Sequence, residues 1–141
     1  MPYILQWPAQ LARGVIYEQP VISLDIFATA TAAAKAPPAV RAGHKIDGID
    51  LLPYLKSNIK AVPHEKLFWR QDRRAALRMG DWKLLKNPRR GQNSEWQLYN
   101  LVTDIAEQNN LVTMNKAKRE ELLSVWRELN SEMDDPFWQR K

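Results

Sequence analysis

The stretch KLFWRQDRRAALRMGDWKLLK, residues 66–86, decides the fold of the C-terminal half of the chain. Two short segments, 66–70 and 75–79, flank the polar residues Gln71-Asp72-Arg73, and this spacing is typical of a β-hairpin. Gly80-Asp81 forms a second turn signal, and the last five residues of the stretch alternate between apolar and polar types as a strand does. The stretch therefore predicts three consecutive antiparallel strands.

Further along the chain, residues 95–101 alternate again and predict a fourth strand. From about Lys116 to Met133, four apolar residues recur at spacings of four, three and four, which is one face of an amphipathic helix. That stripe must be buried, and the sheet is the available partner. We predict an α+β fold in which a four-stranded antiparallel sheet packs against a long C-terminal helix. The stripe consists of Leu122, Trp126, Leu129 and Met133.

A shorter signal lies between the fourth strand and this helix. Asp104 and Glu107 have the spacing of a capping box, in which the first residue caps a helix and the second reaches back to the cap. We predict a one-turn helix here.

The first 57 residues have a different pattern. The apolar run Tyr3 to Trp7 predicts a short strand, which Pro8 closes. Ser23 stands where a helix N-cap is expected, and Asp25 follows in the first turn, where the helix dipole favours an anion. A strand followed by a helix is typical of α/β proteins. The expected helical face consists of Leu24, Phe27, Ala28, Thr31 and Ala34.

Proline and glycine residues mark the division between these two patterns. Pro and Gly residues predict a loop over 35–48, a helical turn or two follows over 49–55, and 57–63 reads as a connector. We therefore predict two parts, 1–60 and 61–141, within a chain whose 141 residues suffice for one ordinary core.

Composition excludes several classes of site. The chain has no cysteine, which removes disulfides, thiolate nucleophiles and cysteine-bound zinc. The two histidines, His44 and His64, are too few and too far apart to predict a histidine metal site. No apolar run reaches the eighteen residues of a membrane-spanning helix, and Met1-Pro2-Tyr3 does not begin a signal peptide. Motifs for a serine elbow, a phosphate loop and a zinc protease are absent from the sequence.

The net charge of +5 is concentrated in one window. Residues 66–90 contain nine basic and two acidic residues, which gives +7 there and leaves −2 for the rest. Such a window can attract a polyanion, or its long side chains can cover a sheet, and composition leaves both interpretations open. The basic residues are Lys66, Arg70, Arg73, Arg74, Arg78, Lys83, Lys86, Arg89 and Arg90.

Individual polar and aromatic residues also have two interpretations. His64 precedes the first strand, where it can face an anionic substrate or hydrogen-bond at the end of an element. Asp134-Asp135 reads as a solvated tail more readily than as a metal site. Trp69, Trp82 and Trp96 could stack bases or sugars, but their strand positions favour core packing.

Six segments of the chain resemble the C-terminal region of type I sulfatases, the formylglycine-dependent arylsulfatase family, and they follow one another in the family's order. RMGDWKL resembles the family's Arg-x-Gly-x-Trp/Tyr-Lys-Leu strand pair, and LYNL with the following Asp, Glu and Asn-Asn-Leu resembles its Leu-Tyr-Asp-Leu…Asp-Pro-x-Glu-x-x-Asn-Leu signature. The order of all six makes the resemblance specific, although Ala28, Asn100 and Ile105 depart from the family's turn and cap residues. The segments lie at 2–8, 23–29, 47–53, 64–70, 78–84 and 98–111.

The resemblance implies the C-terminal third of a sulfuric ester hydrolase, with residues 1–60 a strand–helix remnant of the α/β core and 61–141 the C-terminal subdomain. In the family, a Cys or Ser within Cys/Ser-x-Pro/Ala-x-Arg becomes formylglycine, and Asp and Asn residues bind calcium. None of the five serines here stands in that motif, so no catalytic, cofactor or metal residue is carried over. Calcium and formylglycine are expected in a full-length parent. His64 and Arg70 are the substrate-rim candidates.

We therefore expect this chain to be inactive alone, and a sulfate ester to be the substrate only in a full-length parent. The family is often periplasmic, secreted or lysosomal, and the sequence itself predicts no compartment. Two alternatives remain. The chain could bind polyanions through its basic window, with nucleic acid not favoured, or it could form a homo-oligomer through the exposed N-terminal strand and helix.

Overall fold

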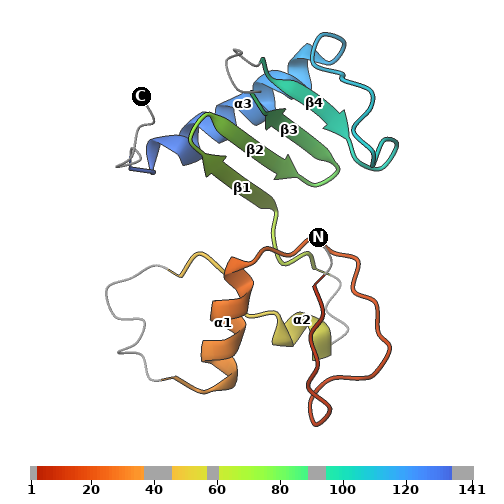
Figure 1. Ribbon diagram of the computed structural model, residues 1–141, viewed down its shortest axis with the longest axis vertical. Coiled ribbons are helices and arrows are strands. Elements are labelled where there is room, and N and C mark those ends of the chain that lie inside the picture. Colours follow the sequence, from red (N-terminus) through yellow and green to blue (C-terminus); the bar gives the residue numbers. More distant parts are fainter. Residues whose placement is uncertain (1–2, 37–45, 57–60, 89–94, 135–141) are drawn as a thin grey trace. The chain divides into compact units, whose positions relative to one another are not determined.

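The structure is a computed structural model that describes residues 3–36, 46–56, 61–88 and 95–134 (Figure 1). The chain divides into two compact units, Met1–His64 and Glu65–Lys141. The assignment of 1–60 to a sulfatase core and of 61–141 to its C-terminal subdomain stays a prediction.

The N-terminal unit contains two helices, α1 (Leu24–Ala33) and α2 (Leu52–Lys56). Ser23 is the N-cap residue of α1, as predicted, but its side chain makes no capping hydrogen bond. The predicted strand over Tyr3–Trp7 is wrong, because residues 3–7 have no regular secondary structure. A strand needs a hydrogen-bonded neighbour, and the described part of this unit contains no strand with which it could pair.

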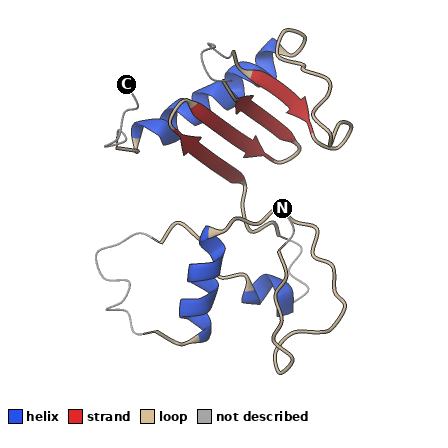
Figure 2. Ribbon diagram, in the orientation of Figure 1, coloured by secondary structure: helices blue, strands red, loops and turns tan. Residues whose placement is uncertain are grey.

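The C-terminal unit contains a four-stranded antiparallel sheet, drawn as arrows in Figure 2, with the strands in sequence order. Two-residue turns join the first three strands. Asp72, with φ +54°, and Gly80, also with φ +54°, each hold the first turn position, as in the type II′ turns that match the twist of a hairpin. The predicted hairpin and third strand are confirmed. The strands are β1 (Lys66–Gln71), β2 (Arg74–Met79), β3 (Trp82–Lys86) and β4 (Gln97–Asn100).

Helix α3 (Lys116–Ser131) packs on one face of this sheet. Asn115 caps it by accepting a hydrogen bond from the backbone N–H of Lys118 at 3.2 Å. Met133, at the end of the predicted stripe, lies beyond the helix and is half exposed. The α+β fold and the packing of the helix on the sheet are confirmed. The buried core consists of Leu77, Leu84, Leu98, Leu122 and Leu123, with Trp126 and Leu129 packed against it.

The capping-box prediction is wrong. Residues 104–107 form turns and no helix, and Glu107 has φ +55°, which a helix does not allow. The Asp104 carboxylate accepts hydrogen bonds from the backbone N–H groups of Gln108 at 3.0 Å and Asn109 at 2.7 Å. These bonds lower the pKa of Asp104. Asp104 therefore closes a loop, and Glu107 points elsewhere.

Candidate functional site

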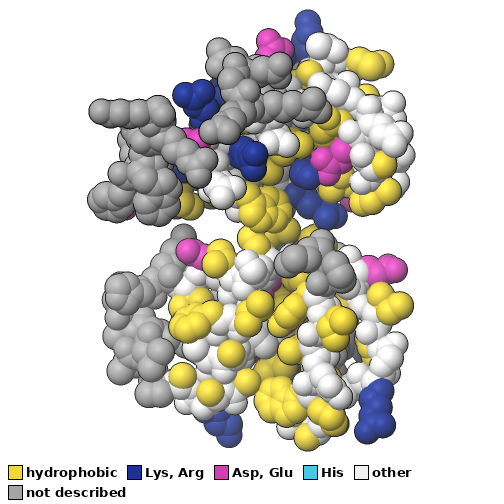
Figure 3. Space-filling view, viewed as in Figure 1, with side chains coloured by type: hydrophobic (Ala, Val, Ile, Leu, Met, Phe, Trp, Pro, Cys, Tyr) yellow, Lys and Arg dark blue, Asp and Glu magenta, His cyan; other side chains and the backbone are white. Residues whose placement is uncertain are grey.

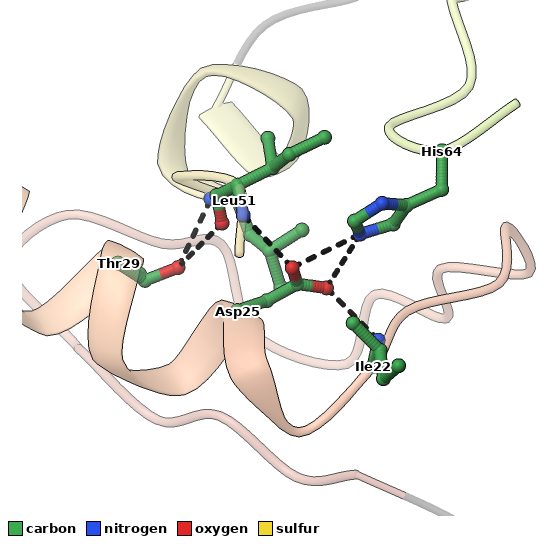
Figure 4. Close-up of polar contacts among 6 residues, drawn as sticks. Ile22, Asp25, Thr29, Leu51 and His64 are labelled. Atoms are coloured by element: carbon green, nitrogen blue, oxygen red, sulfur yellow. Dashed lines mark hydrogen bonds and ion pairs between the residues drawn. The ribbon is translucent and has the colours of Figure 1, made fainter. Parts of the chain in front are cut away.

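Asp25 is the centre of the polar contacts in the N-terminal unit (Figure 4). It lies in the first turn of α1 and is fully buried. Its Oδ2 accepts a hydrogen bond from the backbone N–H of Ile22, and its Oδ1 accepts one from the backbone N–H of Ile49, both at 2.9 Å. A buried carboxylate is stable only when it is well hydrogen-bonded. These two bonds connect the backbone at residues 22 and 49 to α1.

His64 is the third partner of the Asp25 carboxylate. Its Nε2 lies 2.9 Å from both oxygens of Asp25, and its side chain is only 8% exposed. This contact is a hydrogen bond to the carboxylate in the tautomer that carries a proton on Nε2. Asp25 thus joins three segments that are far apart in sequence, around residues 22, 49 and 64.

Thr29 extends this contact by one turn of α1. Its Oγ1 accepts a hydrogen bond from the backbone N–H of Leu51 at 3.0 Å and contacts the carbonyl oxygen of Ile49 at 3.5 Å. Asp25 and Thr29 are four residues apart and so share one helix face. Gly48 allows this close approach, because a Cβ atom there would lie 2.1 Å from the carbonyl oxygen of Leu24.

We call Asp25, Thr29, Gly48 and His64 the Asp25 hub. Its members come from three of the six segments that carry the sulfatase resemblance, at 23–29, 47–53 and 64–70. Within the N-terminal unit, the first two segments and His64, the first residue of the third, therefore lie together. The sequence placed Asp25 correctly in the first turn of a helix, and its four-residue spacing from Thr29 indicates that the two share one helix face. Nothing local in the sequence indicated Ile49 or His64 as partners.

The two substrate-rim candidates lie in different units. The ring of His64 is nearly buried, and its Nε2 is occupied by Asp25. Arg70, on β1, donates from Nη1 to the side-chain oxygen of Asn130 at 2.9 Å and from Nη2 to the carbonyl oxygen of Asp134. Arg70 therefore ties the first strand to the end of α3. Their role at a substrate rim stays a prediction, while the second candidate histidine, His44, lies outside the described residues.

Much of the basic window is engaged within the C-terminal unit. Lys83 lies 2.5 Å from the carboxylate of Glu107, and Nε of Arg78 donates to the carbonyl oxygen of Gly80 at 3.0 Å. Lys86 lies over the ring of Trp96, 5.9 Å from its centroid. Arg89 and Arg90 fall outside the described residues. Both interpretations of the basic window, a polyanion site and a cover for the sheet, stay predictions.

The tryptophans are divided between the two faces of the sheet. Trp82 and Trp96 pack against the leucine core, as predicted, and the ring of Trp96 lies edge-on to Trp126 at 5.0 Å between centroids. For Trp69 the core prediction is wrong, because its side chain is 40% exposed. Its strand partner is Ala76, on the face that α3 does not cover. Alternation placed the ring on a face but could not say which face was covered.

The described residues offer no metal centre of their own. They contain no group of three or more His, Asp or Glu side chains that could hold an ion, and no serine in the chain precedes Pro/Ala-x-Arg. Calcium and formylglycine in a full-length parent stay a prediction. None of the described helices is long and apolar enough to cross a bilayer.

Comparison with known proteins defines the class. The chain is homologous to sulfatases and corresponds to their C-terminal portion. An uncharacterized sulfatase of Schizosaccharomyces pombe is 28% identical over 134 residues, which covers 89% of this chain and 24% of that protein. Human steryl-sulfatase is 39% identical over 68 residues, which covers 48% of this chain and 11% of that enzyme. No family model matches the chain.

A solved structure extends the match to three dimensions. The crystal structure of Ps i-CgsB matches with a TM-score of 0.72 and 28% identity, over 94% of this chain and 29% of that chain. A second crystal structure holds the same protein in complex with k-i-k-neocarrahexaose. This chain therefore spans about a quarter of the S. pombe relative and somewhat more of the structural one.

Proposed function

We propose that this chain acts as the C-terminal portion of a sulfuric ester hydrolase, in which it supports the catalytic core and the rim of the substrate site. The Asp25 hub supports this proposal, because it joins two of the segments that resemble the sulfatase family to His64, the first residue of a third. The hub orients backbone and helix, and it supplies neither a nucleophile nor a metal ligand. We expect no hydrolysis by the chain alone.

The surface of the N-terminal unit also supports a role within a larger protein. Leu24, Ile26 and Phe27 of α1 are each about half exposed, and Figure 3 shows hydrophobic side chains over the visible surface of this unit. A helix that is hydrophobic on most of its faces is normally buried. The exposed face of α1 is therefore suited to cover the remaining part of a sulfatase domain.

Activity of the isolated chain is tested with an aryl sulfate. The 141-residue chain is incubated with 4-nitrophenyl sulfate and added calcium, and release of 4-nitrophenol is followed against a buffer blank. We expect no release above the blank. Hydrolysis that persists through purification and is lost in the Asp25→Asn variant would contradict the proposal.

The supporting role is tested by fragment complementation. Ps i-CgsB is truncated so that it lacks the region matched here, and this chain is co-expressed with it. We expect the two to co-purify and the truncated host to become more soluble. Phe27→Asp, which places a charge on the exposed face of α1, should abolish co-purification.

The matched control is Ser124→Asp, which adds the same charge at an exposed position of α3 in the other unit. Co-purification should survive this change. If the folded chain never associates with the truncated host, or if both variants behave alike, the proposed contact of α1 is wrong.

A further inference from the structure

The two edges of the sheet are treated differently. At the β4 edge, the backbone N–H of Leu111 donates to the carbonyl oxygen of Leu98 at 2.8 Å, and the side chain of Asn110 accepts from the N–H of Leu98 at 3.0 Å. The outer edge of β1 has no main-chain partner within the described part of the chain. An exposed edge strand of six residues is a template for pairing with another strand.

Strand geometry fixes which groups that edge offers. The two-residue turn makes Gln71 and Arg74 the closing pair of the hairpin, and in such a hairpin the closing residues are hydrogen-bonded to each other. Bonding direction then alternates along the strand. The backbone N–H and C=O groups of Lys66, Phe68 and Arg70 therefore point away from β2, toward the open edge.

We propose that a second copy of this chain pairs at this edge, β1 against β1 in antiparallel orientation, so that two sheets join into one about a two-fold axis at Trp69. Opposite residues in an antiparallel pair share a face of the sheet, so the axis must pass through a residue position. An axis at Phe68 sets Lys66 opposite Arg70 of the second copy. That arrangement brings like charges together, and an axis at Arg70 pairs only residues 69–71, because the turn follows Gln71.

The axis at Trp69 has complementary chemistry. It sets Phe68 opposite Arg70 of the second copy, and at each end of the paired strands it brings Lys66 beside the turn residue Asp72 of the other copy. Trp69 then meets its own copy at the central pair, which is not hydrogen-bonded and in which side chains approach closely. Trp69 is 40% exposed in the single chain, so this pairing also buries aromatic surface.

Because the natural chain has no cysteine, single cysteines report the register directly. In the proposed pair, the two Cα atoms of position 69 lie about 4.5 Å apart, within reach of a disulfide. Two copies of position 71 lie about 13 Å apart along the strands, out of reach. We expect Trp69→Cys to form a covalent dimer under mild oxidation and Gln71→Cys, on the same sheet face, to remain monomeric on denaturing gels.

Charge exchange tests the same register without a covalent bond. Lys66→Glu and Asp72→Lys each create like-charge pairs across the axis, and each should raise the dimer dissociation constant about tenfold. The double variant restores opposite charges and should recover most of the affinity. Sedimentation equilibrium over a concentration series measures the constant, and circular dichroism confirms that each variant is folded.

Three outcomes would overturn the proposal. These are a wild-type chain that stays monomeric at every soluble concentration, equal cross-linking at positions 69 and 71, and a double charge variant no better than the single ones. Because the assay reads association of the 141-residue chain with itself, its failure leaves the proposed contact with a sulfatase core untouched.

Discussion

Each of the two units of this chain is stabilised internally by a different kind of interaction. The C-terminal unit has five buried leucines between sheet and helix, whereas the buried apolar residues of the N-terminal unit, among those described, are Ala28, Leu51, Leu52 and Pro63. The N-terminal unit instead relies on Asp25, a fully buried carboxylate with directional bonds to residues 22, 49 and 64. The apolar face of α1 is half exposed, so hydrophobic burial contributes little to the stability of the N-terminal unit.

The two units should therefore respond differently to amino-acid substitutions. A core of interlocked leucines responds to lost volume, because its side chains are closely packed. A hydrogen-bonded hub tolerates lost volume at its margins but responds to the loss of a single acceptor, because its donors are buried.

The largest effect is expected from a cavity in the leucine core. Leu122→Ala removes a fully buried side chain of α3 and should lower the free energy of unfolding of the C-terminal unit by about 3–5 kcal/mol. Chemical denaturation followed by tryptophan fluorescence measures this change. Val102→Ala, at a side chain 71% exposed, should change it by less than about 0.5 kcal/mol. Equal effects would contradict the assignment of the core.

The second effect is steric and belongs to the hub. Gly48→Ala forces a Cβ against the backbone of Leu24, and the overpacking should cost about 3 kcal/mol in the N-terminal unit. Gly14→Ala, where φ is +69° but the surrounding space is open, should cost about 1 kcal/mol from backbone strain alone. Hydrogen exchange at the amides of Ile49 and Leu51 reads the loss locally. If Gly14→Ala is the more damaging change, the close approach of residue 48 to α1 is wrong.

The third effect is the loss of one hub acceptor. Asp25→Asn keeps the shape but replaces one accepting oxygen with an NH₂ group, so a buried donor loses its partner at a cost of about 2 kcal/mol. Faster amide exchange at Ile22 or Ile49 should accompany it. Asp47→Asn is the matched control, because it removes the same charge from an exposed side chain. No difference between the two variants would remove Asp25 from its central place.

Sequence alone predicted the parts of the structure that local pattern determines. The hairpin follows from alternation on both sides of Gln71-Asp72-Arg73, and α3 follows from its stripe spacing. The strand over Tyr3–Trp7 could not be judged locally, because a strand exists only with a partner. Glu107 had capping-box spacing, yet its bond to Lys83, 24 residues away, takes it out of that role.

The candidate site shows the same division. Asp25 was placed in a first helical turn by its neighbours in sequence, but its bonds to Ile49 and His64 span 24 and 39 residues. Those partners depend on the path of the chain between them, which no local periodicity encodes. The resemblance to sulfatases marked all three segments, although it did not indicate that they meet.

The smallest expected effect is a pH dependence of the unfolding free energy of the C-terminal unit. It arises from the loop at Asp104, because the leucine side chains of the core do not titrate. Hydrogen bonds from Asn109 and Gln108 hold the pKa of Asp104 below its ordinary value of 3.8. The ionised carboxylate therefore stabilises the folded loop fully above that ordinary value, and the contribution is lost as the pH falls through the lower folded pKa. Asp104→Asn should flatten the decline of unfolding free energy below about pH 4, measured by denaturation at a series of acidic pH values. Asp81→Asn, whose side chain accepts no hydrogen bond from the described residues, should leave that decline in place. A wild-type decline that persists unchanged in Asp104→Asn would show that other carboxylates carry the acid sensitivity of this unit.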